Sequence, residues 1–218
     1  MMEIHSFDTF KDKGKNGKAP EGHKRIKVHM VCAIKHDGRH KARLVANGNV
    51  TNPPCDGVCS GVASLRSVRF VAFLAELNGM ELWAADVSNA YLESYTVEKA
   101  CIIAGPEFGE LEGRSLIVVR ALCGLGLGGV SWHIRLEVVL KDLGFFECKM
   151  DPDVWMRDMG NHHEHVGTYV DDLEIASKKP KEIFDALTGE HKFKLKGVGP
   201  IFTVMRMEIF VRIRRHVS

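Results

Sequence analysis

Two adjacent carboxylates, Asp171 and Asp172, are the residues best suited to chemistry. They follow a run of β-forming residues, Val166 to Val170, and precede a second apolar run, Leu173 to Ala176. This pattern predicts two strands joined by a turn that carries the acids. Neighbouring carboxylates repel each other, so a divalent cation with oxygen ligands would stabilise the pair. An ordinary acidic turn fits the same residues, because Asp is common in turns.

A third acid, Asp86, strengthens the chemical interpretation. The segment from Glu81 to Val87 is mostly apolar and carries Asp86 near its end, as a strand would. If this strand lies beside the hairpin, carboxylates from two elements form one cluster. Such a cluster suits two-metal phosphoryl transfer, in which one ion activates the attacking oxygen and the other holds the triphosphate.

The motifs around these acids resemble those of reverse transcriptases. Tyr169-Val170-Asp171-Asp172 is similar to the Y-x-D-D signature, and the segment from Asp86 to Leu92 is similar to the motif that bears the first catalytic aspartate. The resemblance is closest to copia-type retrotransposon polymerases and covers roughly residues 22 to 199. Three further segments have counterparts in the same order: Lys41 to Ala46, Ala121 to Leu125, and Asp151 to Asp153.

The resemblance implies RNA-directed DNA polymerisation, in which a primer 3′-hydroxyl attacks a deoxynucleoside triphosphate and releases pyrophosphate. Asp86 and Asp171 would be the main ligands of two Mg²⁺ ions, for which Mn²⁺ is a substitute. The backbone carbonyl of Val87 would be a further ligand, and Asp172 would be a supporting acid.

The same resemblance assigns nucleotide contacts. Lys41 and Arg43 would meet the incoming triphosphate or template phosphates, and Tyr91 would exclude a ribose 2′-hydroxyl by steric contact. The residues that support the two acidic motifs are Asn89, Tyr169 and Val170. The implied partners are an RNA or DNA template-primer, deoxynucleoside triphosphates and other parts of a Pol polyprotein, and no membrane. The expected location is intracellular, in the cytoplasm, a retroelement particle or the nucleus.

Composition is that of an ordinary globular protein. The chain has 218 residues, 45% hydrophobic and 27% charged, and a net charge of only +2, so any polyanion site must be local. No apolar run is long enough to span a bilayer, and no secretory signal is evident at Met1. The six cysteines are scattered, which predicts free thiols in a reducing compartment. The Cys55 and Cys59 pair lacks the second pair that a zinc finger requires.

The fold class expected is α+β: a polymerase palm with an antiparallel sheet backed by helices, and a smaller β-rich fingers portion, without a thumb. Asp37-Gly38 predicts a hairpin between residues 26–34 and 41–45. Apolar spacing predicts helices over residues 62–77, 132–143 and 180–190. Residues 161–165 are predicted to be a polar turn, and residues 191–197 a basic edge strand. The predicted domains are a flexible basic lead-in at 1–24, a fingers and palm domain at 25–199, and a divergent or truncated C-terminal tail at 200–218.

Two alternatives remain open. Gly124, Gly126 and Gly129 match the G-x-G-x-x-G pattern between a β-like and a helix-like run, with Asp151 about twenty residues on, so a dinucleotide-binding domain is a rival. The second alternative is a truncated, non-catalytic relic that binds nucleic acid. It is suggested by Cys123, which stands where the family usually has tyrosine, and by Gly126 and Ser131 in place of basic residues.

Overall fold

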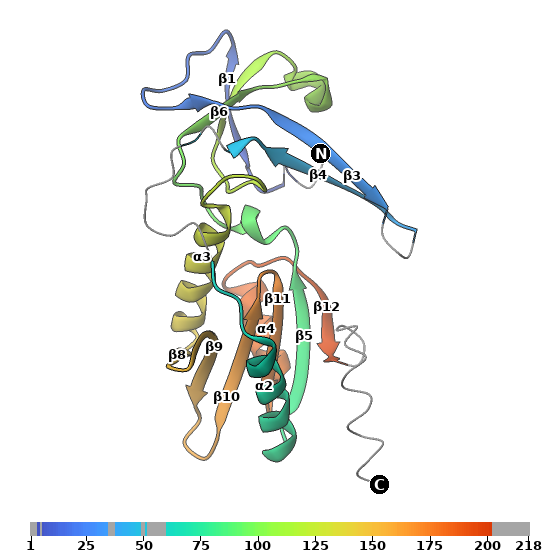
Figure 1. Cartoon of the computed structure of the whole chain (residues 1–218), viewed down its shortest axis with the longest axis vertical. Coiled ribbons are helices and arrows are strands. Elements are labelled where there is room, and N and C mark those ends of the chain that lie inside the picture. Colours follow the sequence, from blue (N-terminus) through green and yellow to red (C-terminus); the bar gives the residue numbers. More distant parts are fainter. Residues whose placement is uncertain (1–3, 5, 35–37, 49–50, 52–59, 202–218) are drawn as a thin grey trace. The chain divides into compact units, whose positions relative to one another are not determined.

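The structure is a computed structural model that describes residues 4, 6–34, 38–48, 51 and 60–201 (Figure 1). The chain divides into two compact units. One comprises Met1–Ser60 and Asn89–Glu137, here called unit 1. The other comprises Gly61–Ser88 and Val138–Ser218, here called unit 2. Each unit has its own sheet and its own buried core.

Unit 2 is built on a six-stranded sheet in which every neighbouring pair is antiparallel. The strand order is β12-β5-β11-β10-β9-β8. Their bounds are β5 Glu81–Val87, β8 Phe146–Cys148, β9 Asp151–Asp158, β10 His163–Tyr169, β11 Asp172–Ser177 and β12 Leu195–Pro200. The predicted acidic hairpin is confirmed as β10 and β11, and the strand bearing Asp86 pairs directly with β11.

Helices pack on both faces of this sheet. Val68, Val71 and Ala75 of helix α2 (Leu65–Leu77) form a buried cluster with strand residues that include Val154 and Ala176. On the other face, the ring of Phe184 in α4 (Pro180–Gly189) stacks 6.4 Å from that of Trp83. The expected α+β fold, an antiparallel sheet backed by helices, is therefore confirmed.

Local signals explain where the helices begin and end. The Ser64 side chain accepts a hydrogen bond from the Ser67 backbone N–H, so α2 begins three residues later than its apolar pattern suggests. It ends at Asn78-Gly79 as predicted, and Gly79 has a positive φ. Helix α3 (Gly128–Asp142) begins before the predicted residue 132, and α4 matches its prediction within one residue.

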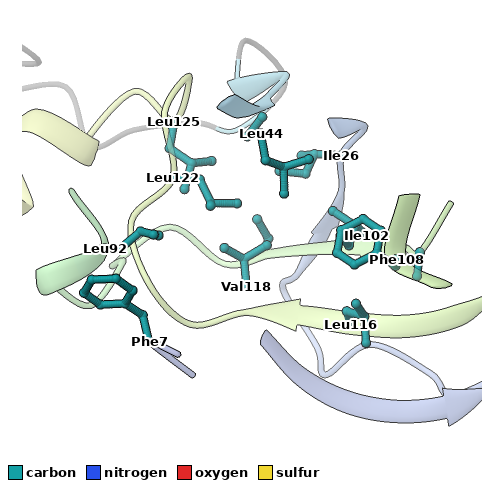
Figure 2. Close-up of a cluster of buried hydrophobic side chains, with 13 residues drawn as sticks. Phe7, Ile26, Leu44, Leu92, Ile102, Phe108, Leu116, Val118, Leu122 and Leu125 are labelled. Carbon is teal, nitrogen blue, oxygen red and sulfur yellow. The ribbon is translucent and has the colours of Figure 1, made fainter. Parts of the chain in front are cut away.

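Unit 1 contains a four-stranded sheet in the order β1-β7-β6-β2 and a two-stranded sheet of β3 and β4. The bounds are β1 Phe10–Lys15, β2 Lys24–Arg25, β3 Val28–Ile34, β4 His40–Ala46, β6 Ala100–Ile103 and β7 Arg114–Val118, with 3₁₀ helices η2 Ala90–Glu93 and η3 Pro106–Leu111. Antiparallel pairing of β3 with β4 confirms the predicted hairpin. Figure 2 shows the buried core, which gathers Phe7, Ile26, Leu44, Leu92 and nine further side chains.

The structure corrects two expectations. Residues 10–15, predicted to be part of a flexible lead-in, form β1 and pair with β7. The single apolar anchor Phe10, whose ring packs edge-on 5.4 Å from Phe108, was too weak a signal among the lysines. Residues His163 to His165, predicted as part of a polar turn, lie in β10, and both Glu164 and His165 are buried.

The dinucleotide-binding alternative is wrong. Strand β7, before the glycines, pairs antiparallel with β1 and β6, whereas β8, after α3, belongs to the other sheet. The βαβ unit that such a domain needs is therefore absent from the described part of the chain. Cys32, Cys101, Cys123 and Cys148 are free, as predicted. Cys55, Cys59 and residues 202–218 lie outside the described residues. Among the described helices, none is long and apolar enough to cross a membrane.

Candidate active site

Two of the predicted acids face each other across adjacent strands. Asp86 near the end of β5 is the direct partner of Asp172 at the start of β11. Residues paired in this way point to the same face of a sheet. Lys196 of β12 pairs with Asp86 on its other side, and Tyr169 of β10 pairs with Asp172. These four residues, here called the carboxylate row, cross the sheet from β12 to β10.

The carboxylate row lies on the same face as helix α2. Ala176 pairs with Leu82, and both residues belong to the cluster around α2. Alternation along β5 and β11 therefore puts Asp86 and Asp172 on that face. The start of α2 is fixed beside the hairpin, because the Ala63 N–H donates to the Thr168 carbonyl at 2.8 Å. Asp151 accepts hydrogen bonds from the Ser64 N–H at 3.0 Å and the Ser67 hydroxyl at 2.5 Å, which gives the Asp151 motif a structural role here.

The third predicted acid, Asp171, lies in the tight turn between β10 and β11. Tyr169 pairs with Asp172, so Val170 and Asp171 alone form the loop. Val170 has a φ of 57°, which costs a β-branched residue about 1–3 kcal/mol. The Val87 N–H donates to the Asp171 carbonyl at 2.6 Å, which ties the turn to the end of β5. A strained turn held in this way is typical of a functional site.

The charges of the neighbouring carboxylates act on Asp172. Burial, followed by the charges of Asp171 and Asp86, raises the pKa of Asp172 to about 6. All three acids are half-buried. Oxygen donors that repel one another in this way fit a hard divalent cation, which would remove the repulsion. Within the described residues, however, no three or more His, Cys, Asp or Glu side chains are grouped closely enough to hold a metal ion.

Two residues near the acids were missed by sequence reasoning. Lys196 brings a cation opposite Asp86, and only the long-range register of β12 reveals it. Glu174 lies two residues after Asp172 on the same face, is only 1% exposed, and has no hydrogen-bond partner among the described residues. Burial raises the pKa of Glu174 to about 8. In the sequence this glutamate looks like the outward residue of a half-exposed strand, so no signal indicated its burial.

The remaining predicted residues belong to unit 1. Lys41 and Arg43 alternate on β4, half-buried and exposed respectively, on the face opposite the buried Leu44. Tyr91 lies in η2, where Cβ atoms added at Gly128 and Gly129 would come within 3.8 and 3.9 Å of its ring and hydroxyl. Asn89 precedes η2 in the left-handed conformation, with a φ of 53°.

Close packing explains part of the glycine-rich segment. Gly124 has a φ of 89°, and a Cβ atom added there would lie 2.1 Å from the Ala46 carbonyl oxygen. The loop is also held by Glu98, a buried carboxylate that accepts hydrogen bonds from the Leu127 N–H at 2.7 Å and from the Thr51 hydroxyl. These contacts account for Gly124 by backbone packing alone.

Comparisons with known proteins agree with these motifs. A family model described as "Reverse transcriptase (RNA-dependent DNA polymerase)" matches residues 15–214. The chain is 28% identical over 203 residues to a retrovirus-related Pol polyprotein from transposon TNT 1-94 of Nicotiana tabacum, covering 87% of this chain and 15% of that protein. It is 26% identical over 208 residues to the transposon Ty1-BL Gag-Pol polyprotein of Saccharomyces cerevisiae, covering 91% of this chain and 11% of that protein.

Among solved structures, one match is a foamy viral protease-reverse transcriptase in complex with double-stranded DNA. The TM-score is 0.48 and the sequence identity 14%, over 91% of this chain and 30% of that chain. The present chain thus spans less than a third of that protein and less than a sixth of the two polyproteins.

Proposed function

The chain belongs to the reverse transcriptase (RNA-dependent DNA polymerase) family, and from this premise we propose that it is the fingers and palm part of an RNA-directed DNA polymerase. The observation that carries the proposal is the pairing of Asp86 with Asp172 on adjacent strands, beside a strained turn that contains Asp171. Acids from two sequence motifs about 85 residues apart thereby lie side by side at the same end of two adjacent strands, as two-metal nucleotidyl transfer requires.

The proposed roles follow the carboxylate row and its turn. Asp86 and Asp171 are the main metal ligands, Asp172 is the supporting acid, and the Val87 carbonyl is a further ligand. Two Mg²⁺ ions, or Mn²⁺ in their place, would activate the primer 3′-hydroxyl and stabilise the charge of the triphosphate. Reverse transcriptases generally use divalent metal ions, and the carboxyl oxygens present here suit that requirement.

The proposed substrates are a template-primer of RNA or DNA and deoxynucleoside triphosphates. Lys41, which is half-buried on β4, and Arg43, which is exposed there, would contact phosphates. Tyr91 would exclude a ribose 2′-hydroxyl on the incoming nucleotide by steric contact. Asn89, Tyr169 and Val170 would support the two acidic motifs. We propose that the polymerase domain includes β1 and therefore begins before residue 25, within a longer Pol polyprotein that acts in the cytoplasm, a retroelement particle or the nucleus.

A second candidate, a non-catalytic nucleic-acid-binding relic, is favoured by one observation. Glu174 places an unpartnered carboxyl in the interior of β11, two residues from Asp172. An uncompensated buried acid destabilises a fold. A chain released from selection for activity can accumulate such a residue, because the stability that catalysis requires is then no longer under selection.

Primer extension separates the two candidates. We would compare the parent chain with Asp171→Asn and with Asp185→Asn, which alters an exposed acid on α4, the helix on the face of the sheet opposite the carboxylate row. Magnesium-dependent extension of a DNA primer on an RNA template by the parent and by Asp185→Asn, but not by Asp171→Asn, is expected. Equal extension by all three proteins would contradict the assignment of Asp171, and extension by none would favour the relic.

A further inference from the structure

A basic surface lies at the start of unit 1, on strands β1 and β2 and the turn between them. It consists of six exposed side chains, Lys11, Lys13, Lys15, Lys18, Lys24 and Arg25, here called the β1–β2 basic surface. Only two carboxylates, Asp12 and Glu21, lie within the same 15 residues. Because the whole chain has a net charge of +2, the excess of four positive charges in this segment leaves the remainder of the chain net negative.

The lysine and arginine side chains of this surface project from strands that are paired with the rest of the sheet. Phe10, Lys11 and Asp12 of β1 pair with Val118, Ile117 and Leu116 of β7. At the other edge of the sheet, the Lys24 N–H donates to the Lys99 carbonyl at 2.9 Å and the Ile26 N–H to the Cys101 carbonyl at 2.9 Å. The backbone that carries these side chains is therefore ordered before any ligand arrives, which lowers the entropic cost of binding.

The register of the four strands shows how side chains on the two edge strands, β1 and β2, are oriented. Lys11 pairs with Ile117, Ile117 with Cys101, and Cys101 with Arg25, so Lys11 and Arg25 point to the same face of the four-stranded sheet. Three strand spacings separate them, about 14 Å. Cys101 and Ile117, between the two edges, are buried. One strand of a nucleic acid duplex carries a phosphate about every 3.4 Å along its axis, so a backbone that reaches from one edge to the other carries several phosphates.

The neighbouring acid is already neutralised, whereas the lysines of β1 are not. Asp12 accepts a hydrogen bond from the Gly14 N–H at 2.7 Å and pairs with Arg114, and these contacts hold the pKa of Asp12 below its usual value. In the described part of the chain, Lys11, Lys13 and Lys15 make no ion pair. Their charge is thus available to an external anion.

The types of side chain exposed on this surface indicate which class of ligand it binds. None of the large apolar side chains that the described structure exposes lies between residues 11 and 25, and the first is Val31. Amphipathic surfaces that insert into a membrane and hydrophobic protein interfaces need such groups. Residues 11 to 25 themselves offer charge, and Ile103 of β6, 40% exposed, lies on the same face of the sheet. A surface dominated by charge suits a phosphodiester backbone, whose binding depends on the number of phosphates contacted and not on base sequence.

We propose that the β1–β2 basic surface binds the phosphate backbone of nucleic acid, independently of the carboxylate row. The inference rests on the proposed function for the identity of the polyanion. It also goes beyond that function, since the family match begins at residue 15 and most of β1 precedes it. The surface would anchor template or primer by electrostatic contacts that do not depend on sequence.

The test is a salt titration of nucleic-acid binding without metal or nucleotide. Fluorescence anisotropy of a labelled DNA duplex would be measured with the full chain from 50 to 200 mM KCl. The variant Lys11→Gln/Lys13→Gln/Lys15→Gln removes three charges from β1. The matched control Lys178→Gln/Lys179→Gln/Lys181→Gln removes three exposed charges from unit 2, and thermal unfolding of both variants verifies their fold.

Each phosphate contact contributes about 0.9 to the slope of log Kd against log salt concentration. If all three lysines contact phosphates, the parent loses about 40-fold more affinity than the β1 variant between 50 and 200 mM KCl, and the control follows the parent. Equal losses in both variants, or parental binding by the β1 variant, would overturn the proposal. So would loss of binding to phosphatidylserine vesicles with unchanged DNA binding, which would assign the surface to a membrane.

The outcomes also separate this proposal from the polymerase assignment. Asp171→Asn is expected to bind the duplex like the parent, because it leaves β1 unchanged. If no protein extends primers but the β1 variant alone loses affinity, the basic surface stands and the polymerase assignment fails. If the parent extends primers and the β1 variant binds as the parent does, only the basic surface is refuted.

Discussion

Glu164 on β10 and Glu174 on β11 are buried carboxylates of the same sheet, with exposed fractions of 3% and 1%. Glu164 receives hydrogen bonds from Arg157, at 3.1 and 2.6 Å, and from the Ser177 hydroxyl at 2.5 Å. Glu174 has no such partner among the described residues. The region around Glu164 uses buried charge to join strands, whereas Glu174 places an uncompensated acid beside the carboxylate row.

The Glu164 region extends through several elements. Arg157 also donates to the Leu143 carbonyl at 2.9 Å and lies over the ring of Phe145, and Ser177 accepts from the Lys179 N–H. The carboxylate row, by contrast, contains Asp172, whose pKa is raised by burial and by the charges of Asp171 and Asp86, and it lies beside a turn with an unfavourable φ. This difference indicates that the interactions of β9 and β10 stabilise the fold, whereas the carboxylate row lowers the free energy of unfolding. A site that binds a cation is expected to show this cost when the cation is absent.

The largest effect is expected from breaking the satisfied network. Glu164→Leu should lower the free energy of unfolding by about 3–5 kcal/mol, because it leaves the half-buried Arg157 guanidinium without its carboxylate. Urea denaturation measures the change. As a control, Glu182→Gln removes an exposed partner of Lys179 and should leave the urea midpoint unchanged. A loss of under 1 kcal/mol in Glu164→Leu would show that the network is not a source of stability.

Replacing the unsatisfied acid should have the opposite sign. Glu174→Leu is expected to raise the free energy of unfolding by roughly 2–4 kcal/mol at pH 8, since an apolar side chain removes the cost of burying an unpartnered carboxyl. The same urea assay measures it. If Glu174→Leu destabilises the protein as Glu164→Leu does, both carboxylates stabilise the fold. That result would contradict the assignment of Glu174 as a destabilising, unpartnered acid.

The burial of Glu174 should also make the free energy of unfolding depend on pH. Burial raises the folded-state pKa of Glu174 from 4.5 to about 8, so the folded protein retains a proton that the unfolded chain releases. The contribution of this group is fully present below pH 4.5 and is lost as the pH rises to about 8. The stability difference between Glu174→Gln and the parent should therefore grow from pH 5 to pH 8. A difference that is constant with pH would show that Glu174 titrates normally.

The smallest effect is expected at the strained turn. Val170→Gly should raise the free energy of unfolding by up to about 1 kcal/mol, because glycine adopts a positive φ without steric cost. Val97→Gly, at an exposed residue without a positive φ, should lower it instead. Thermal unfolding of both variants makes the comparison, and equal losses would mean that Val170 is not strained.

The sequence predicted those features whose signals are local. Alternating apolar residues and acids located β5, β10 and β11, and the spacing of Ile183, Phe184 and Leu187 located α4. Features that depend on long-range register were not predictable. Lys196 opposite Asp86 requires β12 to pair with β5, and the burial of Glu174 requires α2 to cover its face. Strand β1 was missed because one aromatic residue anchors it among lysines.

The central claim is that Asp86, Asp171 and Asp172 act together as a divalent metal site. Binding of Mn²⁺ would be measured by electron paramagnetic resonance with the parent and with Asp86→Asn, Asp171→Asn and Asp185→Asn. We expect the parent and Asp185→Asn to bind the ion, and substitution of either proposed main ligand, Asp86 or Asp171, to weaken binding at least tenfold, about 1.4 kcal/mol. Equal binding by all four proteins, or by none, would contradict it.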